Sequence, residues 1–175
     1  MGVVYRSLAA SFAAVGLVLL SIPAIVPSAS AREVVEFRGE ASPGTIVVRT
    51  GERRLYYVLG KGQAIRYLVG VGRVGRQWAG RSFIDGKHVR PDWAPPPDIA
   101  REHPNMPKLI RGGAPNNPMG VAALTLSGGQ YAIHGTNNPN SIGGFVSYGC
   151  IRMYNQDIVD LYDRVNVGTP VMVTR

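Results

Sequence analysis

Short runs of β-branched and aromatic residues, separated by glycine-containing turns, are the feature that most restricts the fold of this chain. Three such runs follow one another at residues 45–49, 54–59 and 64–69. This pattern is typical of the strands of a β-meander. The 175 residues also include 22 glycines and 13 prolines, which favour short strands and shaped loops over a helix bundle. We therefore expect a mainly β fold.

Residues 122–127 and 130–134 flank a Gly128-Gly129 pair. Two glycines between two strand-like runs are typical of a tight hairpin turn. The C-terminal residues 169–174 also form a strand-like run, with Pro170 at its start, where no ladder donor is needed. We expect all three runs to be strands.

One short helix is predicted near the C-terminus. Asn155 is its expected N-cap, and Gly168 is expected to end it. Apolar residues follow the N-cap at helical positions i, i+3, i+4 and i+7, namely Ile158, Leu161, Tyr162 and Val165.

Residues 85–118 contain eight of the 13 prolines and show no regular apolar period. A segment of this length inside a compact domain is typical of a functional loop or a disordered one. We expect it to form a lid or a groove wall. Just before it, residues 70–75 match the G-x-G-x-x-G pattern, but residues 76–83 have no helical period. A dinucleotide site needs that loop to open a helix, so we expect a glycine-rich turn there.

The first 31 residues have the three-part pattern of a secretory signal. Arg6 supplies a positive charge, residues 8–20 are apolar, and Ala29-Ser30-Ala31 offers small residues for cleavage. An uncleaved membrane anchor is the alternative, because the apolar stretch can be extended to Val26. We expect a protein exported to the periplasm or cell envelope. Its predicted parts are a signal peptide at 1–31, a polar linker at 32–43 and one folded domain at 44–175.

The chain is basic, with a net charge of +8. A basic exported protein is expected to be attracted to anionic cell-wall polymers or lipid headgroups, although scattered basic residues also serve solubility alone. Nucleic acid is not an expected partner outside the cytoplasm. The chain has one cysteine and three dispersed histidines, which do not form the ligand pattern of a zinc site. We expect no metal and no organic cofactor.

Chemistry is predicted at the single cysteine. Cys150 lies between Gly149 and Ile151-Arg152, and His134 lies sixteen residues upstream. A thiol becomes a good nucleophile as the thiolate, which requires a nearby base or positive charge. His134 is the candidate base and Arg152 the candidate charge. Gly149 allows a sharp turn that leaves backbone amides free to face an oxyanion.

An inert, buried cysteine is the alternative to a catalytic one. However, an unpaired thiol in an exported protein risks oxidation, so its presence calls for a reason. Papain-like enzymes and cell-wall cysteine peptidases place the cysteine before the histidine. Because no histidine follows Cys150, these classes of enzyme are excluded. Sortase-type transpeptidases have the order His, Cys, Arg with much wider spacing and remain an alternative.

The sequence around these residues resembles the L,D-transpeptidase catalytic domain (YkuD) family over about residues 44–173. The most specific matches are Ile133-His134-Gly135-Thr136 and Ser147-Tyr148-Gly149-Cys150-Ile151-Arg152-Met153. Residues 91–96 and 117–120 match weaker upstream signatures. The resemblance implies a β-sandwich with one short helix after the catalytic loop, a long Pro-rich loop, and a groove that contains the cysteine and the histidine.

The resemblance also implies roles for single residues. Cys150 would be the nucleophile and His134 its general base, oriented through the backbone carbonyl of Gly135. Backbone amides of the loop, including that of Cys150, would form the oxyanion hole, and an arginine would bind or orient the substrate. The residues expected to bind the substrate or the oxyanion are Ser147, Tyr148, Gly149 and Arg152.

The implied reaction is acyl transfer from peptidoglycan stem tetrapeptides. The thiol attacks the carbonyl before the terminal D-Ala, and D-alanine leaves. An amine of a neighbouring stem then resolves the thioester in a 3→3 cross-link, or another acceptor does so, such as an outer-membrane protein or a free amine. Carbapenem-type β-lactams are the expected inhibitors.

Two positions depart from the family pattern. Tyr148 stands where the family commonly has His, and the family's Thr-Pro-x-Gly is missing near Trp78. A catalytically silent cell-wall binding module of the same fold is therefore an alternative function.

Overall fold

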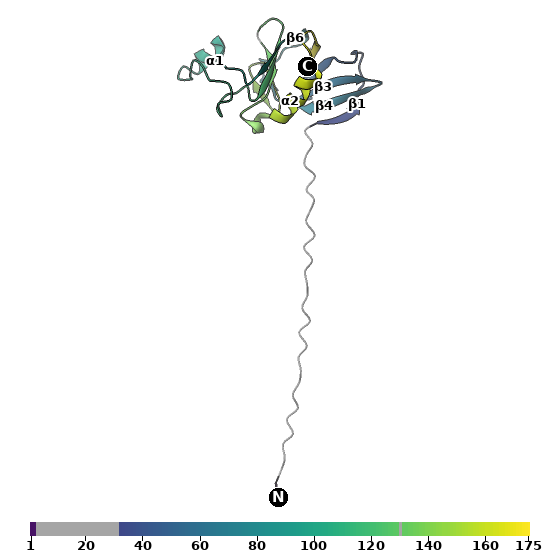
Figure 1. The fold of residues 1–175 in the computed structure, drawn as a ribbon, viewed down its shortest axis with the longest axis vertical. Helices are drawn as coiled ribbons and strands as arrows, with labels where there is room; N and C mark the ends of the chain where they lie inside the picture. The colour runs from purple at the N-terminus through teal and green to yellow at the C-terminus, as the bar shows by residue number, and fades with distance from the viewer. Residues whose placement is uncertain (3–31, 130) are drawn as a thin grey trace.

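The computed structural model describes residues 1–2, 32–129 and 131–175 (Figure 1). Its main element is a nine-stranded sheet with the strand order β1-β4-β3-β2-β11-β6-β7-β8-β10. Apart from its first two residues, the predicted signal peptide lies outside the described residues. Within the described part of the chain, no helix is both long and apolar enough to cross a membrane. The predicted mainly β class is confirmed.

One half of the sheet contains the predicted meander. Its strands are β1 (Arg32–Glu36), β2 (Ile46–Arg49), β3 (Arg54–Gly60), β4 (Gln63–Leu68) and β11 (Pro170–Thr174). Strands β2, β3 and β4 pair antiparallel in sequence order. The C-terminal strand β11 pairs parallel with β2 and antiparallel with β6, and so joins the two halves.

The other half consists of β6 (Gly80–Val89), β7 (Ala122–Leu126), β8 (Ala132–His134) and β10 (Ile151–Arg152). Strand β6 pairs with β11 through its first residues and with β7 through its last, with a register shift between Ile84 and Gly86. Such irregularities bend a strand, and this one lies where β6 passes from one half of the sheet to the other. Residues from both halves pack into one buried core, which includes Ile46, Leu55, Tyr67, Ile84, Leu124, Ile133 and Leu161.

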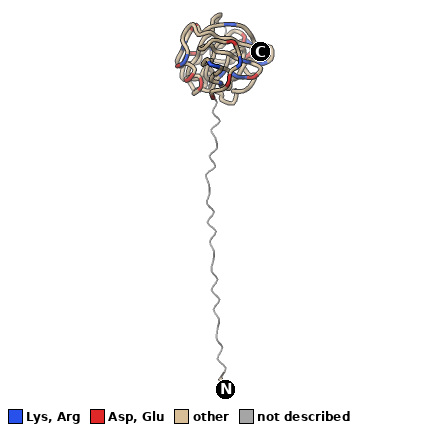
Figure 2. Tube along the Cα trace, turned by 90° about the vertical axis from the view of Figure 1, so that its right-hand side faces the viewer, with Lys and Arg blue, Asp and Glu red and all other residues tan. Residues whose placement is uncertain are grey.

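Helix α2 (Asn155–Arg164) packs on this core through Ile158 and Leu161, as its apolar spacing predicts. A short helix α1 (Pro97–Glu102) lies in the Pro-rich segment, at the end of the molecule away from β1 (Figure 1). The remaining elements are a 3-10 turn η1 (Pro139–Ser141) and a small parallel sheet of β5 (Val71–Gly72) and β9 (Phe145–Ser147). Acidic and basic residues are interspersed along the folded chain (Figure 2).

The predicted linker is wrong for residues 32–36. These residues form β1, which pairs antiparallel with β4 along its whole length. Phe37, also in the predicted linker, is buried against Tyr56 with the ring centroids 5.5 Å apart. The sequence gives a weak strand signal here, because most side chains of this edge strand are exposed and show no apolar alternation.

Three further predictions need correction. The irregular Pro-rich segment is shorter than predicted, since residues 85–89 belong to β6, and it contains a second helix, α1. The N-cap of α2 is Tyr154, without a side-chain cap. Asn155 is already helical, and its Oδ1 accepts hydrogen bonds from the amides of Val121 and Thr136 at 3.4 and 3.0 Å. The glycine-rich residues 70–75 contain β5 and a turn and open no helix, as expected.

Candidate active site

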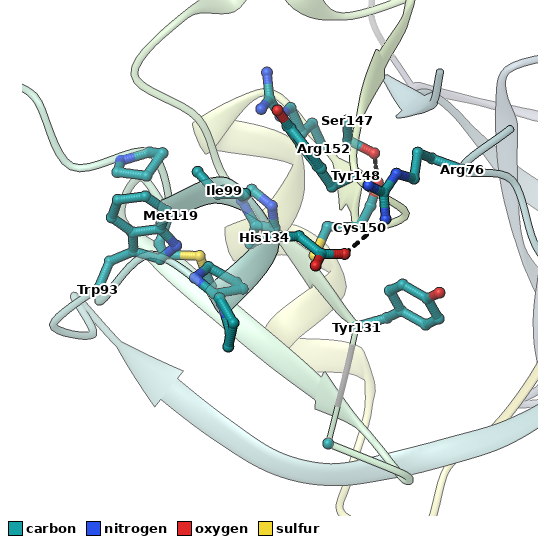
Figure 3. Close-up of a pocket in the computed structure, with 15 residues that line it drawn as sticks. Arg76, Trp93, Ile99, Met119, Tyr131, His134, Ser147, Tyr148, Cys150 and Arg152 are labelled. Carbon is teal, nitrogen blue, oxygen red and sulfur yellow. Dashed lines mark hydrogen bonds and ion pairs between the residues drawn. The ribbon is translucent and has the colours of Figure 1, made fainter. Parts of the chain in front are cut away.

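A pocket of about 450 Å³ lies between the end of β8, the loop before β10 and the start of α1 (Figure 3). Its lining brings together most of the residues predicted for the site. These are His134, Ser147, Tyr148, Cys150 and Arg152. The opposite wall comes from the Pro-rich segment, with Trp93, Pro97 and Ile99, and from Met119 just after it.

The pairing of two short strands brings these residues together. Strand β10 runs parallel to β8, with Ile151 opposite Ile133 and Arg152 opposite His134. The amide of Met153 donates to the carbonyl of His134 at 2.8 Å and extends the pairing. The sulfur of Cys150, just before β10, therefore lies at the edge where β8 ends.

His134 is buried, with 4% of its surface exposed. Its Nδ1 lies 2.6 Å from the carbonyl oxygen of Gly135. A carbonyl only accepts, so Nδ1 donates, and Nε2 of the neutral ring keeps its lone pair. Burial, and then the charge of Arg152, lower the pKa of His134 to about 4, against the opposing effect of the Gly135 and Pro118 carbonyls. The ring is therefore neutral at pH 7 and can accept a proton.

Cys150 is half-buried. Burial raises the pKa of its thiol, although the backbone of Ala132 and the charge of Arg152 favour the thiolate. The resting site thus contains a thiol and a neutral imidazole, and the predicted effect of Arg152 is outweighed by burial. Within the described residues, no hydrogen bond joins the sulfur to the His134 ring. Such contacts often form only when substrate is bound.

The loop before Cys150 is fixed by its own hydrogen bonds. Gly149 has a φ of +127°, and a side chain there would meet Tyr131 Cε1 at 2.3 Å, so only glycine fits. Ser147 Oγ accepts from the Gly149 amide at 3.0 Å and donates to the Cys150 carbonyl at 2.6 Å. The Gly149 amide is therefore occupied and does not serve the predicted oxyanion hole. The amides of Tyr148 and Cys150 remain the candidates.

Trp78 supports this loop from outside the predicted motif. Its indole Nε1 donates to the carbonyl of Gly149 at 3.0 Å. Its ring stacks on Tyr131 with 4.9 Å between centroids and 7° between planes. From the sequence alone, Trp78 marks only the place where the family's Thr-Pro-x-Gly is missing. No spacing rule connects it to a cysteine 72 positions later, and only the sheet brings the two segments together.

Arg152 and Tyr148 differ in where their side chains lie. Arg152 lines the pocket, and its Nε is buried without a hydrogen-bond partner among the residues that the structure describes. Tyr148 also lines the pocket, but its hydroxyl donates to Glu102 of α1.

Across residues 32–129 and 131–175, no group of three or more His, Cys, Asp or Glu side chains could hold a metal ion.

Comparison with known sequences gives a match that includes the pocket residues described above. A sequence model of the L,D-transpeptidase catalytic domain family matches residues 43–173. The probable L,D-transpeptidase ErfK/SrfK of Escherichia coli is 39% identical over 137 residues, which cover 73% of this chain and 43% of that protein. The chain thus spans less than half of the length of the curated relatives that it matches.

Solved structures share the fold. The catalytic domain of an L,D-transpeptidase from E. faecium, acylated by ertapenem, has a TM-score of 0.58 at 18% identity, covering 78% of this chain and all of that one. A Brucella melitensis chain described as a probable carnitine operon oxidoreductase has a TM-score of 0.54 at 38% identity, covering 79% and 89%. On the match over residues 43–173, the chain belongs to the L,D-transpeptidase catalytic domain family.

Proposed function

We propose that this protein is an exported L,D-transpeptidase that acts on peptidoglycan stem tetrapeptides, with Cys150 as nucleophile and His134 as general base. The observation that most supports this is the parallel pairing of β10 with β8, which brings both residues to one pocket. The neutral His134 ring, with Nδ1 bonded to Gly135, has the tautomer that a general base needs at Nε2.

In the first step, Cys150 attacks the carbonyl that links the third stem residue to the terminal D-Ala. The S–C bond forms as the thiol proton passes to His134 Nε2, and the oxyanion faces the amides of Tyr148 and Cys150. The C–N bond to D-alanine then breaks, and the proton on His134 passes to the leaving amine. The product is a thioester on Cys150.

In the second step, an amine attacks the thioester. The C–N bond forms, the C–S bond breaks, and His134 transfers the proton of the amine back to the sulfur. An amine of a neighbouring stem gives a 3→3 cross-link, and an outer-membrane protein or free amine is an alternative acceptor. Arg152, with its unpartnered buried Nε, is proposed to bind an oxygen of the substrate.

This function places the protein in the periplasm or cell envelope, and the residue pattern of the first 31 positions supports export. We also propose that carbapenem-type β-lactams acylate Cys150. The E. faecium relative acylated by ertapenem supports this proposal.

The test is D-alanine release from a disaccharide tetrapeptide. Cys150→Ala should lose this release entirely, and Cys150→Ser should lose most of it, because a hydroxyl ionises far less readily than a thiol. Circular dichroism of both variants controls for folding. Release by Cys150→Ala at the wild-type rate would refute the nucleophile. A wild type that binds sacculi but releases no D-alanine would instead support the silent binding module.

A further inference from the structure

Helix α1 forms one wall of the pocket without being anchored in the core. Asp98 and Ile99 of α1 line the pocket that contains Cys150 (Figure 3). None of the residues of α1 is buried. The position of this wall therefore depends on polar contacts at the surface of the helix.

The last residue of α1 is bonded to the loop that precedes the nucleophile. The Tyr148 hydroxyl donates to Glu102 Oε2. Arg73 Nη2 donates to the same oxygen at 2.9 Å, and its guanidinium lies over the Tyr148 ring, 4.1 Å from the centroid. Tyr148 is two positions before Cys150, so this contact joins the end of α1 to the catalytic loop.

The first turn of α1 also forms an ion pair, with Arg76 of the pocket lining. Arg76 Nη1 donates to Asp98 Oδ2 at 2.8 Å, and its Nη2 lies 3.5 Å from Glu102 Oε1. The Arg76 guanidinium also lies 5.4 Å from the centroid of the Tyr148 ring. Both acidic residues at the ends of α1 are therefore bound by a cluster that has Tyr148 at its centre.

We propose that the Tyr148–Glu102 contact holds α1 over the pocket and thereby sets how the acyl-enzyme divides between an amine acceptor and water. This inference rests on the proposed function. Both outcomes break the C–S bond of the Cys150 thioester and return a proton to sulfur through His134. An amine forms a C–N bond and a cross-linked product, whereas water forms a C–O bond and releases the stem tripeptide.

The physical reason is the access of bulk water to the thioester. A wall held against the catalytic loop limits bulk water at the thioester, while an acceptor bound in the pocket keeps its place. If α1 loosens, water reaches the thioester more often. Glu102 and the Tyr148 hydroxyl are positioning groups in this scheme, because they act through α1, whereas the oxyanion role proposed for Tyr148 belongs to its backbone amide.

The experiment incubates the full chain with the tetrapeptide substrate and an amine acceptor at a fixed concentration. It measures the cross-linked product, the stem tripeptide and the total D-alanine released. Glu102→Gln and Tyr148→Phe should each lower the ratio of transfer to hydrolysis by about two- to fivefold, the range that exposed ion pairs and single hydrogen bonds give. The double variant should lower it by less than the product of the two single effects, because both changes remove one contact.

Glu33→Gln is the matched control. Glu33 forms an ion pair with Arg66, and the side chains of this pair are about as exposed as those of Glu102 and Arg73. Glu33 lies on β1, at the edge of the sheet opposite to β10. This variant should keep the wild-type ratio. Added salt should lower the wild-type ratio and affect Glu102→Gln less, since salt screens exposed charges.

An unchanged ratio in both Glu102→Gln and Tyr148→Phe, measured while the wild type releases D-alanine, would overturn this inference and leave the proposed function intact. Failure of the wild type to release D-alanine would overturn the proposed function and this inference with it. An equal fall in the ratio for Glu33→Gln would also overturn it, since the effect would then not depend on α1.

Discussion

The pKa of His134 determines the pH range in which the proposed site can act. Burial beside Arg152 lowers that pKa from the usual 6.5 to about 4. Above pH 4 the ring is neutral and accepts the thiol proton, and below pH 4 it is protonated and cannot. We expect the acid limb of kcat/KM for D-alanine release to lie near pH 4. A limb near pH 6.5 would show that the ring is solvated and that the geometry described here is not the active one.

Other single residues show which of the spatial contacts at this pocket can be predicted from the sequence. The motif residues His134 and Cys150 lie in the same pocket because their short flanking strands pair with each other. The hydrogen bond between the Gly149 amide and Ser147 Oγ could not be predicted, because it depends on the side-chain rotamer within a turn. The position of Tyr148 could not be predicted either, since its partner Glu102 lies 46 positions earlier.

At the level of elements, the loop before Cys150 depends on a contact from a distant segment. Trp78→Phe keeps the stack on Tyr131 but removes the N–H that donates to the Gly149 carbonyl. A net hydrogen bond contributes about 1 kcal/mol. We expect kcat/KM to fall by about three- to tenfold while the melting temperature changes little. Unchanged kinetics would show that stacking alone positions the loop.

Strands and helices with a buried face are the elements that a sequence pattern can predict. The meander, the last strand and α2 have buried faces, so their apolar residues recur at the expected spacing. Strand β1 and helix α1 have no fully buried residue and therefore leave no such pattern. The residue type of Asn155 favours an N-cap, but its side chain instead accepts hydrogen bonds from amides of two other segments.

For the whole molecule, the boundary of the folded domain is testable. A chain that begins at Arg32 retains β1 and the buried Phe37, whereas one that begins at Gly44 loses both and exposes the edge of β4. We expect the shorter chain to be less stable by about 3 kcal/mol, the usual cost of losing a buried aromatic side chain. It should also aggregate more readily. Equal free energies of unfolding in urea would show that β1 and Phe37 contribute nothing to the stability of the domain.

The central claim is that the Cys150 sulfur forms a covalent bond to an acyl group with help from His134. The most direct measurement is the intact mass of the protein after incubation with ertapenem, followed by peptide mapping. We predict one adduct, located on Cys150, that is absent in Cys150→Ala and forms much more slowly in His134→Ala. An adduct on any other residue, or one that forms equally in Cys150→Ala, would contradict the claim.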